Sequence, residues 1–132
     1  MKRSKEIVFV LLGAMFWYQA SLIIKYFGES VFTERNPKLI LFFALAIPIT
    51  IISMYLTALI CKLKQNELLK PVVIMTFTAT FLDAIALVWF REIYSNSFEI
   101  ALHGSAWILW GVGIGLLLSY LLQKRITKKN YK

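Results

Sequence analysis

Four long apolar stretches dominate the order of hydrophobic and polar positions along this chain. Each is uncharged or nearly so, and the charged residues gather in short blocks between them. A helix needs about 20 mostly apolar residues to cross roughly 30 Å of hydrocarbon at about 1.5 Å per residue. The pattern therefore predicts four transmembrane helices, at about residues 7–27, 39–61, 71–94 and 99–123.

Short links between these stretches limit how the helices can be arranged. The links carry the turn-forming residues Pro, Asn and Ser, and they hold few residues. Links this short place successive helices side by side and antiparallel. We therefore expect an all-α fold, a single membrane domain over residues 1–132 built as an up-down-up-down bundle of four helices. Pro48, inside the second helix, removes one backbone hydrogen bond and should kink that helix, and Thr50 or Ser53 can compensate the freed carbonyl.

The net charge of +8 is distributed unevenly along the chain. The N-terminus, the second link and the C-terminal segment carry 11 of the 15 Lys and Arg residues, and the other four lie near the opposite ends of the helices. Cytoplasmic loops are enriched in Lys and Arg, so we expect both termini in the cytoplasm and the chain in the plasma or inner membrane. We expect the basic residues to contact the lipid bilayer and its headgroups, not nucleic acid. The first stretch should be retained as an anchor, because bulky Tyr18 and Gln19 stand where a signal-peptide cleavage site needs small residues.

Small and polar residues fall on particular faces of the predicted helices. The clearest stripe lies on the fourth helix and consists of Gly104, Gly111, Gly115 and Ser119. Small residues let helix backbones approach closely in lipid, so this stripe predicts either the interior of the bundle or the seam of a homodimer. Most Trp and Tyr residues lie toward the half of the bundle away from the termini. They favour an aromatic belt at the membrane surface, with an aromatic-lined pocket as the alternative.

Asp83 is the only acidic residue near the middle of a predicted span. An acid at this depth costs about 2.5–3.5 kcal/mol on insertion, so its presence needs a reason. An isolated carboxyl in hydrocarbon is expected to be neutral and to donate a hydrogen bond, whereas a nearby cation would hold it ionised. The candidate partners are His103 and Arg91, but Arg91 lies off the helical face of Asp83, and we expect its side chain to extend to the outer rim instead.

Three further polar residues, Thr76, Thr80 and Glu99, complete the candidate site around Asp83, His103 and Arg91. Thr76 and Thr80 share the face of Asp83, and Glu99 can pair with His103 at a spacing of four residues. Together with Arg91, Glu99 and His103, the aspartate outlines a polar crevice that opens outward. Two interpretations remain open: Asp83 binds an ion, a proton or a substrate, or it is a hydrogen-bonded residue that fixes the register of the helices.

Enzyme chemistry finds no support in the residue types present. The chain has one histidine and one cysteine, no paired carboxylates within a span, and no metal-binding or phosphate-binding motif. We therefore expect a protein without catalytic activity, metal or cofactor.

Two segments in the second half of the chain resemble a known family. They are "TATFLDAIALVWFREIYSN", residues 78–96, and "GSAWILWGVGIGLLLSYL", residues 104–121. They are similar to small four-helix bacterial membrane proteins that are classified only as a domain of unknown function. The family shows an aspartate after a leucine in span three, an aromatic-rich exit and a Gly- and Trp-rich opening of span four. The matching positions here are Asp83, Trp107, Trp110 and Gly111.

The resemblance implies a fold and a location for the site, but no activity. At the exit of span three, Arg91 and Glu92 stand where the family has more apolar residues and a proline.

Three functions fit these observations. The first is binding or transport of a small molecule or ion through Asp83, in a monomer or a homodimer. The alternative is a non-catalytic accessory, assembly or immunity-type subunit of a larger membrane partner. The third is binding of a lipid or another apolar ligand in the aromatic half of the bundle.

Overall fold

The computed structural model describes the backbone of residues 3–64 and 67–130 and the side chains of residues 5–64 and 67–125. This part of the chain forms four α-helices and no strand, which confirms the predicted all-α fold. A short 3₁₀ helix, η2, follows the third α-helix. The bounds are α1 Arg3–Val31, α2 Pro37–Cys61, α3 Leu69–Trp89, η2 Arg91–Ile93 and α4 Phe98–Asn130.

All four helices are long and apolar enough to cross a membrane, as the apolar stretches predicted. The shortest, α3, has 21 residues, which corresponds to about 31 Å at 1.5 Å per residue and matches the roughly 30 Å of a hydrocarbon core. Large apolar side chains cover the outside of the bundle, and Tyr26 and Ile40 are each 77% exposed. Such a surface is typical of a membrane protein, because lipid is its solvent.

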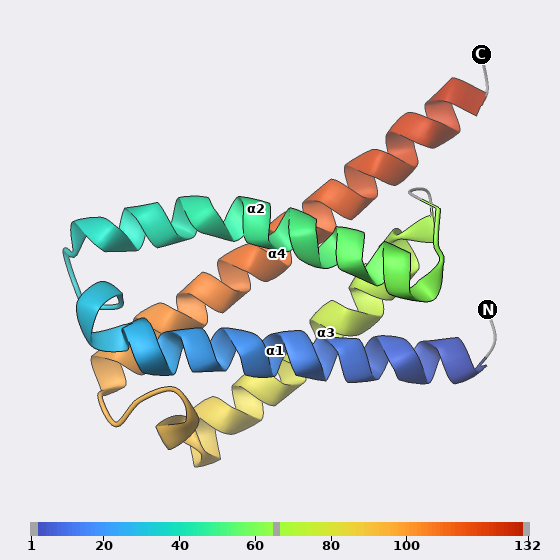
Figure 1. Ribbon diagram of the computed structural model, residues 1–132. Coiled ribbons are helices and arrows are strands. Elements are labelled where there is room, and N and C mark those ends of the chain that lie inside the picture. Colours follow the sequence, from blue (N-terminus) through green and yellow to red (C-terminus); the bar gives the residue numbers. More distant parts are fainter. Residues whose placement is uncertain (1–2, 65–66, 131–132) are drawn as a thin grey trace.

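The helices run up, down, up and down, so that the start of α1 and the end of α4 lie on the same side of the bundle (Figure 1). The α1–α2 pair crosses the α3–α4 pair obliquely in this view. Each helix of one pair lies against one helix of the other: α1 packs most extensively on α3, and α2 on α4.

Local hydrogen bonds define the ends of α2. Asn36 caps its start, because the side-chain oxygen accepts a hydrogen bond from the Lys38 N–H at 2.9 Å and Pro37 occupies the first helical position. At the other end Lys62 adopts a left-handed conformation and its N–H donates to the Ala58 carbonyl. The helix is continuous through Pro48, whose side chain is exposed on its outer face.

The expected compensation of the carbonyl that Pro48 frees, that of Ala44, is wrong: in the described part of the chain neither Thr50 nor Ser53 donates to it. Ser53 donates instead to the carbonyl of Ile49, the residue after the proline. Separately, Trp107 and Trp110 of α4 donate through Nε1 to the carbonyl oxygens of two α2 residues, Phe42 at 2.7 Å and Phe43 at 2.9 Å. These two bonds fasten α4 to α2.

The third helix ends earlier than expected, at Trp89 and not near residue 94. The Phe90 N–H still donates to the Ala86 carbonyl, and the chain then turns through η2. This turn brings Tyr94 back against the bundle, where its side chain is fully buried. The reason for the early end is therefore tertiary: the turn places one aromatic residue inside.

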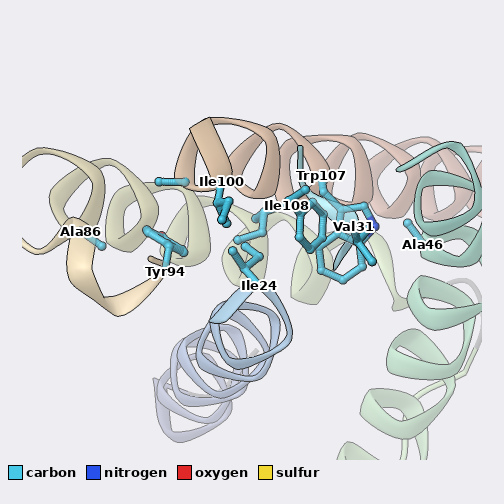
Figure 2. Close-up of a cluster of buried hydrophobic side chains, with 10 residues drawn as sticks. Ile24, Val31, Ala46, Ala86, Tyr94, Ile100, Trp107 and Ile108 are labelled. Carbon is cyan, nitrogen blue, oxygen red and sulfur yellow. The ribbon is translucent and has the colours of Figure 1, made fainter. Parts of the chain in front are cut away.

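Two clusters of buried apolar side chains form the core. One contains residues of all four helices and the turn after α3, and in Figure 2 it extends from Ala86 and Tyr94 through Ile24 to Trp107 and Ala46. The second cluster lies nearer the termini and is built around Phe9 and Val72 of α1 and α3, with Met54 of α2.

Candidate functional site

Asp83 lies in a buried chain of hydrogen bonds that joins three segments. Trp17 of α1 donates through Nε1 to the Tyr94 hydroxyl oxygen at 3.0 Å. The Tyr94 hydroxyl in turn donates to Oδ1 of Asp83 in α3. Asp83 is 5% exposed and Tyr94 is 0% exposed, so both are removed from the surroundings. We call Trp17, Tyr94 and Asp83 the clasp.

The raised pKa of Tyr94 favours the observed direction of the hydrogen bond, from the phenol to the carboxyl. Burial raises the pKa of Tyr94 above its ordinary value, and the hydrogen bond and charge of Asp83 raise it further. The phenol therefore keeps its proton and can donate to the carboxyl. The rings of Trp17 and Tyr94 also meet edge to face, with centroids 6.4 Å apart. The clasp ties the turn after α3 to both α3 and α1.

The structure gives the other expected partners of Asp83 different contacts. His103 lies near its own helix backbone, with Nδ1 2.8 Å from the Glu99 carbonyl oxygen. The Arg91 guanidinium lies over the Phe98 ring, 5.3 Å from its centroid. Neither candidate contacts Asp83 directly, because Tyr94 occupies the position of the partner. The exposed Arg91 lies away from the aspartate, as its place off that helical face suggested.

Glu99, Thr76 and Thr80 also form local hydrogen bonds and do not meet in one crevice. The Glu99 carboxylate accepts a hydrogen bond from the Glu34 N–H in the link between α1 and α2. Thr80 is exposed, and its hydroxyl donates to the Thr76 carbonyl at 2.7 Å, as Thr76 does to the Val73 carbonyl at 3.0 Å. The proposed crevice of Asp83, Arg91, Glu99 and His103 is thus replaced by separate local contacts.

A cavity of about 160 Å³ lies where the four helices meet, and it is partly open to the surroundings. We call it the central cavity. Its walls are almost entirely apolar, with Phe16 and Trp17 from α1, Met75 from α3, and Trp107 and Ile108 from α4. The helix α2 contributes Ala46, Ile49, Thr50, Ser53 and Met54.

Few polar groups face the central cavity. Ser53 and Thr76 line it, but both hydroxyls donate to carbonyls of their own helices. The Thr50 hydroxyl has no hydrogen-bond partner within the part of the chain that the structure describes. Asp83 does not line the cavity and lies one helical turn beyond Ala79, which does. The cavity can therefore take an apolar molecule and offer it one hydroxyl.

The glycine stripe of α4 faces inward, toward the bundle. A Cβ at Gly104 would lie 2.6 Å from Cγ2 of Ile24, so this glycine permits the close approach of α1 and α4. Gly111 and Gly115 line the central cavity opposite Thr50, where a Cβ would lie 3.8 Å and 3.4 Å from its side-chain atoms. Ser119 completes the stripe: it is fully buried, and its hydroxyl donates to the Leu116 carbonyl at 3.0 Å.

Three important residues do not stand out as contact partners in the sequence. Trp17 and Tyr94 fit the pattern of an aromatic belt, although Tyr94 also falls on the predicted helical face of Asp83. Gly13 has no pattern around it, yet a Cβ there would lie only 2.7 Å from the Met75 carbonyl oxygen. No group of three His, Cys, Asp or Glu residues that could hold a metal ion occurs in the described segments.

One protein family matches most of the chain. A family model described as "Family of unknown function (DUF5367)" matches residues 31–126. The match confirms the resemblance seen in residues 78–96 and 104–121. No curated protein and no solved structure matches the chain.

Proposed function

Because the chain belongs to this family of unknown function (DUF5367), its role must be inferred from its own site, and we propose that it binds a small, mostly apolar molecule within the membrane. The observation that supports this proposal is the central cavity, whose walls come from all four helices. Its volume of about 160 Å³ resembles that of an engineered cavity of about 150 Å³ in another protein, which stays dry and binds benzene.

The polar groups near the cavity define the ligand further. A charged ligand would lose its hydration without gaining a partner in the apolar walls, and this loss disfavours ions. The Thr50 hydroxyl can form one hydrogen bond with a weakly polar ligand. Asp83 accepts its hydrogen bond from Tyr94, which supports a structural role for the carboxyl. The proposal therefore moves the ligand site from Asp83 to the central cavity, and it includes no catalytic step and no cofactor.

A heavy-atom quencher tests this site directly. Bromobenzene should quench the fluorescence of Trp17 and Trp107, which line the cavity, in a saturable way in detergent-purified protein. In Gly111→Leu the new side chain would fill the cavity, so the saturable component should disappear. Gly113→Leu is the matched control, because Gly113 is exposed and a Cβ added there would have open space within 4 Å. Equal quenching in wild type and Gly111→Leu would refute the proposal.

We further propose that the protein lies in the plasma or inner membrane and that both of its termini are in the cytoplasm. The support is the bias of Lys and Arg toward the ends of α1 and α4 and the α2–α3 link. In a Cys61→Ser background, an exposed Glu34→Cys should react with a membrane-impermeant maleimide on intact cells, and Lys64→Cys should not. The reverse labelling would overturn this orientation.

One observation favours a second candidate, an accessory or immunity-type subunit or a homodimer that docks through α2. Only 11% of the apolar segment of α2 is buried within the chain, against 28–39% for the other three helices. A partner helix would cover the exposed face around Ile52 and Tyr55. Purification in mild detergent tests this candidate: a larger protein in stoichiometric amount, or a homodimer, would support it, and a bare monomer would count against it.

A further inference from the structure

A second hollow lies at the end of the bundle where α1 begins and α4 ends. It is a groove of about 500 Å³ between α1 and α3. Its walls are apolar and include Ile7 and Leu11 of α1 and Ile74 and Phe77 of α3. Its two charged lining residues are Glu6 and Lys70. We call it the α1–α3 groove, and it is separate from the central cavity.

The depth of this groove suits an acyl chain. Glu6 and Lys70 lie at the ends of the candidate spans, where lipid headgroups are found. Phe77 lies seven residues further along α3 than Lys70, which is about 10 Å deeper at 1.5 Å per residue. One leaflet of hydrocarbon is about 15 Å thick, half of the usual 30 Å. The apolar walls are therefore long enough to line a lipid acyl chain through most of one leaflet.

The charged residues at the mouth of the groove form an ion pair, with Lys70 Nζ 3.2 Å from Glu6 Oε1. Their side chains are about half exposed, at 52% for Lys70 and 44% for Glu6. Exposed pairs of this kind contribute little to stability, so a ligand can replace their mutual contact at small cost. The mouth thus presents one cation and one anion next to each other.

We propose that the α1–α3 groove binds a phospholipid with an ethanolamine headgroup. The Lys70 ammonium pairs with the lipid phosphate, the Glu6 carboxylate accepts hydrogen bonds from the lipid ammonium, and one acyl chain lies along Ile7, Leu11, Ile74 and Phe77. Charge complementarity selects this headgroup. A glycerol headgroup has no cation for Glu6, and the quaternary ammonium of choline has no N–H to donate to it.

Native mass spectrometry can measure this preference. The full-length protein would be released from nanodiscs that contain equal amounts of phosphatidylethanolamine, phosphatidylglycerol and phosphatidylcholine with identical acyl chains. Wild-type protein should retain phosphatidylethanolamine over each of the others by about tenfold, the factor that one additional charge-assisted hydrogen bond can supply. Equal retention of the three lipids, or a preference for phosphatidylglycerol, would overturn the proposal, since bulk positive charge would then explain any binding.

Variants separate the headgroup from the acyl chain. Glu6→Gln should abolish the preference for ethanolamine over choline, and Leu11→Trp should fill the groove and lower the retention of all three lipids alike. Glu92→Gln, at the opposite end of the bundle, is the matched control and should change nothing. An unchanged preference in Glu6→Gln would also overturn the proposal. Gly111→Leu should leave lipid retention intact, so this result is independent of the central cavity.

Discussion

Replacing Tyr94 with Phe tests whether the clasp holds the turn after α3 in place. The substitution keeps the buried ring and removes only the hydroxyl, so it creates almost no cavity. Two groups lose their partner: the Trp17 N–H, which donates to the hydroxyl at 3.0 Å, and the Asp83 carboxyl, which accepts from it. A buried polar group without a partner costs about 1–3 kcal/mol. For the two groups together we expect a loss of about 2–6 kcal/mol in the free energy of unfolding.

Reversible unfolding in mixed micelles, with increasing mole fractions of dodecyl sulfate, measures this loss through near-UV circular dichroism. Tyr26→Phe is the control, because Tyr26 is 77% exposed. This control should change the free energy of unfolding by no more than about 0.5 kcal/mol.

A second variant strengthens the test. When both partners of a buried hydrogen bond become apolar, no desolvated group remains between them. Tyr94→Phe combined with Asp83→Leu should therefore be more stable than Tyr94→Phe alone, by about 1 kcal/mol or more. The reasoning is refuted if Tyr94→Phe unfolds within the margin of the Tyr26→Phe control.

Two further predictions use the same unfolding measurement. Asp83→Asn keeps an oxygen that accepts from the Tyr94 hydroxyl, so it should cost less than about 1 kcal/mol, and a loss as large as that of Tyr94→Phe would show that the charge itself is required. Gly13→Ala should cost about 1–3 kcal/mol, because its Cβ would lie 2.7 Å from the Met75 carbonyl oxygen. Gly113→Ala, with open space around the added carbon, should be neutral or stabilising, and equal losses at the two glycines would contradict the packing of α1 on α3.

Most of the fold follows from the order of apolar and charged residues. Four apolar stretches with short links predict four antiparallel helices, since each stretch is long enough to cross a membrane and each link is too short for a crossover. The end of α3 could not be placed in this way. Residues 90–94 contain neither glycine nor proline, so nothing local stops the helix after Trp89. The helix ends there because the following turn buries Tyr94.

The same turn helps to explain why only one of the three clasp residues was predictable. Asp83 is conspicuous in the sequence because an acid within a span is costly. Tyr94 lies 11 residues further on, and on a continuous helix that spacing would separate the two residues by about 16 Å. Only the break after Trp89 lets them form a hydrogen bond. Trp17, the third member, is 77 residues away from Tyr94, and periodicity along one helix carries no information about such a contact.

Trp17 is the residue through which the clasp and the central cavity affect each other. Its ring forms part of the cavity wall, and its Nε1 donates to Tyr94. The indole is therefore held in place by the clasp, and the shape of the cavity depends on where that ring lies. A ligand that packs against the ring would stabilise the turn after α3, and by linkage the intact turn would strengthen ligand binding by the same free energy. On the proposed function, Asp83 therefore supports an apolar site without touching its ligand, because it anchors the tyrosine that holds the Trp17 ring in the cavity wall.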